Sequence, residues 1–102
     1  MMRNIHFFDL KPGYTIEQFL ESIREFEAYT LAHGCSERTT RKLHDAHSGG
    51  TPAEIQQYMN ESLWPSVEAA NATMAAIPEG IRTKVEAARA MGDNWKTVRY
   101  VD

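Results

Sequence analysis

The sequence predicts a small α+β domain with helices on one face of a four-stranded antiparallel sheet. Three observations lead to this fold class. An apolar strand at residues 4–10 is followed at once by a capped amphipathic helix. Polar residues with strand propensity follow that helix, which is typical of an antiparallel sheet. Two further helical segments precede a last strand at residues 95–101. With 102 residues, the chain is expected to form one domain, residues 1–102.

The first third of the chain contains the clearest local signals. Strand 4–10 carries apolar residues on both faces, and a Pro-Gly turn ends it because proline has no ladder donor. Thr15 and Gln18 fit a capping box. An apolar stripe at helical spacing follows: Ile16, Phe19, Leu20, Ile23 and Phe26. Gly34 suits the position after the helix end, so we expect a helix of about 18 residues.

The middle of the chain is more polar. Residues 35–44 carry charges and threonines, which predicts an edge strand or one that faces water, and residues 45–51 are expected to form a loop. The segment Thr51–Glu54 has the cap, proline and glutamate of a helix start. Apolar residues then alternate as in a strand. Because the sheet needs a fourth strand, we predict one at residues 55–61 rather than a helix.

Helical spacing returns in the last third of the chain. A second helix is expected from Trp64-Pro65-Ser66 to Ile77, since proline is tolerated in a first turn. Residues 78–80 interrupt it, and a third helix is expected to end at Gly92. The last predicted strand, residues 95–101, alternates aromatic and β-branched residues with polar ones.

The composition excludes several classes of function. The formal net charge is −3, and Lys and Arg are scattered rather than clustered, so we expect no nucleic-acid partner. One cysteine rules out an internal disulfide and favours a reducing compartment. No apolar run approaches the roughly 20 residues of a membrane span, and no signal peptide is evident. We therefore expect a cytoplasmic protein without a membrane partner.

The predicted order of elements matches the ferredoxin-like split βαβ arrangement. At this length the chain resembles the dimeric α/β-barrel superfamily. The resemblance is carried by Ile5 to Gly13, a strand that ends in Leu-Lys-Pro-Gly. This opening looks like that of several of its families, including NIPSNAP-like and related uncharacterised bacterial ones. The resemblance implies a homodimer whose two sheets enclose a barrel, with a pocket between sheet and helices or inside the barrel.

Known members of the superfamily imply three functions. The first is a cofactor-free enzyme, monooxygenase or isomerase-like, that acts on a small, partly apolar molecule. The second is a non-catalytic module that binds or senses a small ligand, and the third is a structural dimer with a filled barrel. Fold alone does not decide among them. The sequence identifies no cofactor, and whether the chain is an enzyme stays open at this stage.

His6 is the candidate catalytic residue. If odd-numbered residues of strand 4–10 face the helices, His6 and Phe8 face the barrel, where His6 can act as a general base because imidazole titrates near neutral pH. Tyr58 or Tyr100 would orient the substrate. The competing interpretation, which we favour, is a histidine hydrogen-bonded at the dimer face.

Aromatic and basic residues form the candidate binding set. Phe8, Tyr58, Trp95 and Tyr100 can line a pocket for a flat ligand, although packing in the core or at the dimer interface is the interpretation that we favour. Arg38 can bind a carboxylate or phosphate on the sheet. Solvated edge charge, or a salt bridge to Glu37 or Glu54, is the alternative that we favour for Arg38.

His44 and His47 are weak candidates for metal ligands. They stand three residues apart beside Asp45, a spacing at which two imidazoles can share an ion. A third ligand is missing locally, and only His6 or Glu61 would supply one through the fold. We favour a solvated loop and predict no metal site.

Overall fold

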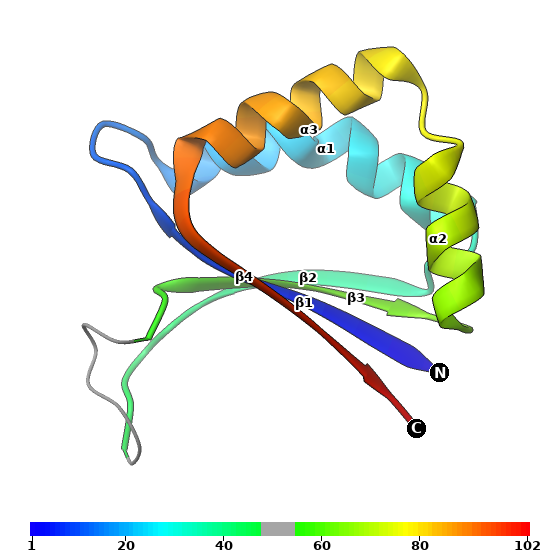
Figure 1. The fold of residues 1–102 in the computed structure, drawn as a ribbon. Coiled ribbons are helices and arrows are strands. Elements are labelled where there is room, and N and C mark those ends of the chain that lie inside the picture. The colour runs from blue at the N-terminus through cyan, green and yellow to red at the C-terminus, as the bar shows by residue number, and fades with distance from the viewer. Residues whose placement is uncertain (48–54) are drawn as a thin grey trace.

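The computed structural model describes residues 1–47 and 55–102. These residues form one antiparallel sheet of order β2-β3-β1-β4, with the helices on one of its faces (Figure 1). The strands are β1 (Met2–Leu10), β2 (Glu37–Lys42), β3 (Tyr58–Trp64) and β4 (Gly92–Val101). The helices are α1 (Ile16–Ala32), α2 (Val67–Ala75) and α3 (Glu79–Met91). This is the predicted ferredoxin-like α+β arrangement, which is confirmed.

Helix α1 forms as its sequence predicts. The Gln18 backbone N–H donates to Thr15 Oγ1 at 3.2 Å, and the Thr15 N–H donates to Gln18 Oε1 at 2.8 Å, which completes the capping box. The chain leaves the helix through Gly34, whose φ of +112° suits glycine. The buried residues of this 17-residue helix are Phe19, Ile23, Phe26 and Thr30, whereas Ile16 and Leu20 of the predicted stripe are half-buried.

The ambiguous middle segment is a strand, displaced by a few residues from the predicted 55–61. β3 lies between β1 and β2, so ladder hydrogen bonds hold it on both sides. Trp64, predicted to start the second helix, ends this strand with a buried side chain. Helix α2 then starts at Val67, with Ser66 as its N-cap. The helix-start signature at 51–54 and part of the predicted loop 45–51 lie outside the described residues.

The remaining boundaries are close to prediction. β2 is an edge strand, as expected, although it is shorter than residues 35–44. β4 begins at Gly92, three residues before the predicted start, because the chain already pairs there with Leu10 of β1. Helices α1 and α3 lie side by side above the sheet, and α2 stands across one end of it (Figure 1).

Even-numbered residues of β1 point toward the helices, which corrects the orientation considered above. The ring of Phe8 stacks on Phe19 of α1 with centroids 4.6 Å apart, and His6 lines a cavity beneath the helices. His6 and Phe8 therefore do not face the barrel side. Alternation along a strand determines which residues share a face. Because both faces of this strand carry apolar residues, the sequence does not indicate which face packs against the helices.

The core consists of two clusters of buried side chains between sheet and helices. One gathers at α2 and contains Met2, Cys35, Trp64 and Ala70. The other gathers beneath α1 and α3 and contains Phe8, Phe19, Ile23 and Ala88. Among the described residues, no helix has the length and apolar character needed to cross a membrane.

Candidate functional site

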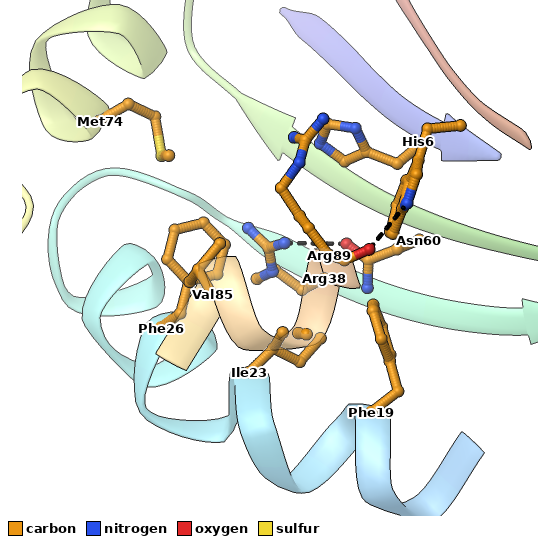
Figure 2. Close-up of a pocket in the computed structure, with 11 residues that line it drawn as sticks. His6, Phe19, Ile23, Phe26, Arg38, Asn60, Met74, Val85 and Arg89 are labelled. Carbon is orange, nitrogen blue, oxygen red and sulfur yellow. Dashed lines mark hydrogen bonds between the residues drawn. The ribbon is translucent and has the colours of Figure 1, made fainter. Parts of the chain in front are cut away.

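Two adjoining cavities lie between the helices and the sheet and share His6, Phe26, Arg38 and Met74 as walls. The apolar cavity, of about 120 Å³, is completed mainly by Phe19, Ile23, Val85, Ala88 and Trp95 (Figure 2). The second cavity, of about 130 Å³, is completed by Asn4, Ser62, Thr97 and Arg99 together with Trp64 and Ala70, and is called the polar cavity because it has more polar side chains in its walls than the first. An apolar protein cavity of ~150 Å³ holds one benzene molecule, so each cavity accommodates about one small ring.

Hydrogen bonds hold the imidazole of His6 at the junction of these cavities. Its Nδ1 lies 2.7 Å from Thr97 Oγ1, and its Nε2 lies 3.2 Å from Asn4 Nδ2. Asn4 Oδ1 accepts from Arg99 Nε at 3.4 Å, so the Asn4 amide turns its N–H donors toward His6. The proton of the neutral imidazole is thereby assigned to Nδ1, and Nε2 carries the free electron pair.

The surroundings of His6 keep it uncharged. Burial, followed by the positive charges of Arg38, Arg89 and Arg99, lowers the pKa of His6 from 6.5 to about 4. At neutral pH the ring is therefore uncharged with its Nε2 electron pair available, and the lowered pKa makes it a weak base while no anion is bound. A negative charge placed among these arginines would raise that pKa again, because it would stabilise the imidazolium.

Arg38 is buried rather than solvated, which corrects the interpretation favoured from the sequence. Its side chain is only 5% exposed, and its Nε lies 3.3 Å from Glu27 Oε2 on α1. Its Nη2 donates to Asn60 Oδ1 at 2.9 Å, the bond drawn in Figure 2, and its Nη1 donates to Thr30 Oγ1. The guanidinium also lies 4.8 Å from the ring centre of Phe26. Among the described residues its acidic partner is therefore Glu27 and not the expected Glu37; Glu54, the other expected partner, lies outside the described residues.

Two arginines that line the cavities, Arg89 and Arg99, were not predicted as site residues from the sequence. Arg89 comes from α3, with its guanidinium 5.4 Å from the Trp95 ring. Arg99 comes from the edge strand β4 and donates to Asn71 on α2 as well as to Asn4. Every second residue of β4 lies on the same sheet face. Which of the two faces contains Arg99 becomes clear only from the pairing of β4 with β1.

Of the four aromatic residues predicted to line a pocket, only Trp95 lines one of the two cavities. Trp95 lines the apolar cavity. Phe8 is fully buried and packs behind it, with its ring stacked on Trp95 at 4.6 Å. Tyr58 stacks on the other side of Phe8 and lines neither cavity, and Tyr100 is 62% exposed and pairs with Arg3 on the opposite sheet face. Neither tyrosine is therefore placed to orient a molecule at His6.

The two loop histidines do not assemble a metal site with the candidates for a third ligand. His47 Nε2 lies 3.3 Å from Asp45 Oδ1, and both side chains are exposed. His6 points toward the helices, whereas Glu61 lies on the opposite sheet face, where it contacts Arg3 and Arg41. Within residues 1–47 and 55–102, no group of three or more histidine, cysteine or acidic side chains is arranged to hold an ion.

Comparisons with known proteins show the fold. No protein-family model and no curated protein sequence matches the chain. The cofactor-independent oxygenase SnoaB from Streptomyces nogalater is similar in structure, with 16% identity and a TM-score of 0.72 over 99% of this chain and 91% of its own. Hydroxynitrile lyase from Passiflora edulis has 14% identity and a TM-score of 0.75 over 99% and 92%. A dimeric ferredoxin-like protein of unknown function from Jannaschia sp. CCS1 has 12% identity and a TM-score of 0.77 over 99% and 98%. These likenesses establish that the chain has the ferredoxin-like fold of these proteins.

Proposed function

We propose that the chain is a cofactor-free enzyme in which His6 takes a proton from a small, partly apolar molecule bound in the two cavities. The observation that carries this proposal is the neutral imidazole at the junction of the apolar and polar cavities, held by Thr97 and with its tautomer set by Asn4. The base atom is Nε2. A substrate that gives its proton to Nε2 takes the place of the Asn4 amide there.

The chemistry follows from the anion that proton removal creates. If the imidazolium returns the proton to a different carbon, the result is an isomerisation that needs no other reactant. If dioxygen adds to the carbanion, the imidazolium protonates the product to a hydroperoxide, and loss of water leaves a carbonyl group. In both cases the surrounding arginines stabilise the negative charge as it develops.

Proteins of the same fold support this proposal. SnoaB is described as a cofactor-independent oxygenase, and a further structure with a TM-score of 0.67 and 18% identity is described as an antibiotic biosynthesis monooxygenase. A relationship to NIPSNAP-like or related bacterial families rests on the residues from Ile5 to Gly13. A cytoplasmic location is part of the proposal, from the composition of the chain.

The test is proton exchange at carbon. Ring-sized aryl ketones are incubated with the protein in deuterated water, and deuterium uptake is followed by NMR, with oxygen consumption measured in parallel. We expect at least one ketone to exchange about 100-fold faster than in buffer, the usual gain from a positioned base. His6→Gln should lose this gain. His33→Gln should keep it, because His33 lies at the end of α1 and lines neither cavity. Equal exchange with wild-type protein and His6→Gln for every ketone tested would sink the catalytic role.

The cavity volumes favour a second candidate, a protein without catalysis. Both cavities are smaller than the ~300 Å³ at the lower end of typical ligand pockets. A structural dimer would bind no small molecule, whereas a sensing module would bind a ligand and leave it unchanged. Thermal shift and product analysis on the same compounds separate these outcomes from the enzyme.

We also propose that the chain forms a homodimer through the open face of its sheet, which carries no helix among the described residues (Figure 1). That face carries a group of apolar side chains beside the ion pairs that Glu61 forms with Arg3 and Arg41, and exposed apolar side chains of this kind need cover. Its apolar side chains are Ile5, Phe7, Met59, Leu63 and Val98.

Sedimentation at micromolar concentration tests the dimer. Val98→Glu, which places a charge among the apolar side chains of this face, is expected to give monomers. Leu31→Glu on α1, at a side chain that is 49% exposed, should leave the dimer intact. A monomeric wild-type protein under these conditions contradicts the proposal.

A further inference from the structure

The walls of the two cavities contain three arginines and no carboxylate. Arg38, Arg89 and Arg99 line them, and no aspartate or glutamate among the described residues does. Only Arg38 has an acidic partner, Glu27. Within residues 1–47 and 55–102, neither Arg89 nor Arg99 forms a salt bridge. Three guanidinium charges against one carboxylate leave an excess of about two positive charges beside two adjoining cavities of about 120 and 130 Å³.

These arginines come from three separate elements, yet all three place a positive charge near His6. Arg38 is on β2, Arg89 on α3 and Arg99 on β4. Figure 2 shows the side chains of Arg38 and Arg89 in the cavity that His6 lines. The positive charges of all three arginines lower the pKa of His6. Each element therefore delivers a cation to the junction of the cavities.

The guanidinium groups of Arg38 and Arg99 also have N–H donors that form no hydrogen bond with the described residues. A guanidinium has five N–H groups. Arg38 uses three of them, toward Glu27, Thr30 and Asn60. Arg99 uses two, toward Asn4 and Asn71. The unused donors are suited to an oxyanion, because guanidinium binds planar carboxylates through two parallel hydrogen bonds.

We infer that the molecule bound at this site is a small organic acid in its anionic form: one ring or a short apolar chain that carries a carboxylate or a similar oxyanion. The inference rests on the proposed function in that the same site holds the substrate. The oxyanion lies in the polar cavity between Arg38 and Arg99. The apolar body lies in the apolar cavity against Phe19 and Trp95, and the atom next to His6 is the one that reacts.

The same features disfavour other ligand classes. A metal ion or an organic cation would meet arginines and no acidic wall residue. A nucleotide or a polyphosphate is too large for two cavities that each hold about one ring. A neutral ring would fill the apolar cavity but leave Arg99 of the polar cavity without a counter-charge.

The test compares matched acids and amides. Benzoate, phenylacetate and salicylate are each titrated against the corresponding amide by calorimetry at pH 7 and low salt. We expect at least one acid to bind about tenfold more tightly than its amide, which corresponds to one charge-assisted hydrogen bond. NMR should show that this acid raises the pKa of His6, whereas the amide leaves it unchanged. Equal affinities throughout, or no acid binding at millimolar concentration, would overturn the inference.

Variants at the exposed arginines locate the effect. Arg89→Gln and Arg99→Gln are expected to reduce the preference for the acid on the order of fivefold each, as for partly solvated ion pairs. Arg82→Gln on α3 is the matched control, since Arg82 is exposed and lines neither cavity. A preference that survives both Arg89→Gln and Arg99→Gln, or that falls equally in Arg82→Gln, assigns the selectivity elsewhere and contradicts the proposal.

The outcome is separable from that of the catalytic test. If acids bind in preference to amides but no compound exchanges protons, the anion site stands and the enzyme does not. If His6-dependent exchange occurs with neutral ketones and no acid binds, the enzyme stands and the anion site does not.

Discussion

Replacing Glu27 by glutamine is expected to lower the free energy of unfolding by about 2 kcal/mol, because the buried guanidinium of Arg38 loses its counter-charge. Arg38 is the most buried cation among the salt bridges that the structure describes, with a side chain 5% exposed. Glutamine has nearly the size of glutamate and can still accept a hydrogen bond from Arg38 Nε. The substitution therefore removes charge and little else.

The magnitude follows from the surroundings of the pair. Removing one partner of a fully buried ion pair costs about 3–5 kcal/mol. Glu27 is 24% exposed, so water already screens it in part. Arg38 also keeps its hydrogen bonds to Thr30 and Asn60. Both features reduce the expected cost to about 2 kcal/mol.

The same helix supplies a matched control. Glu21 pairs with Arg24 at 3.1 Å, and both side chains are 70% exposed. Such surface pairs contribute about 0.3–0.5 kcal/mol, so Glu21→Gln should have almost no effect. Burial is the main difference between the two pairs.

Urea unfolding at pH 7 and one fixed protein concentration measures both variants, with circular dichroism as the signal. The midpoint should fall for Glu27→Gln while the m-value stays constant. If the two variants differ by less than about 0.5 kcal/mol, within the range of a surface pair, the account of Arg38 as a buried cation that depends on Glu27 is refuted.

Three further predictions concern His6, Gly92 and Thr15. The unfolded chain protonates His6 near pH 6.5, whereas the folded chain does so only near pH 4. The free energy of unfolding should therefore fall by up to about 3 kcal/mol as the pH drops through this window, and chemical denaturation of His6→Gln should show a shallower slope. A Cβ at Gly92 would lie 2.6 Å from a ring carbon of Trp95, so Gly92→Ala should cost about 1–3 kcal/mol and change the tryptophan fluorescence; unchanged stability and emission would show that the ring moves freely. Thr15→Ala removes the cap of α1 and should lower the melting temperature, at a cost of about 1 kcal/mol, while an unchanged melting temperature would mean that the cap contributes nothing.

Local signals sufficed for much of the fold. The capping box, apolar stripe and terminal glycine of α1 lie within 20 residues of one another, and all agree. The polar composition of residues 35–44 correctly indicated an edge strand. For β3 the local pattern was divided between helix and strand, and pairing with β1 and β2 decided the outcome. Its end at Trp64 depends on burial against α2, which a local pattern does not contain.

The candidate site could be predicted only in part. His6, Arg38 and Trp95 were recognised from their residue types. Arg89 and Arg99 were not, because a single arginine on a helix or an edge strand usually faces water. Tyr100 was included by type, but its alternation places it with Arg3 on the open face. The register between β1 and β4 separates these cases, and it joins residues about ninety positions apart.

By itself, the sequence determined the order of elements, the helix α1 and the candidate base, because these depend on spacing within a few turns or on residue chemistry. Only the tertiary structure decided that His6 faces the helices and that cations from β2, α3 and β4 surround it. The physical reason is that strand alternation specifies two faces without saying which one is covered. The packing of Phe8 against Phe19 determines which face of β1 the helices cover. The pairing register then determines which face the side chains of the neighbouring strands lie on.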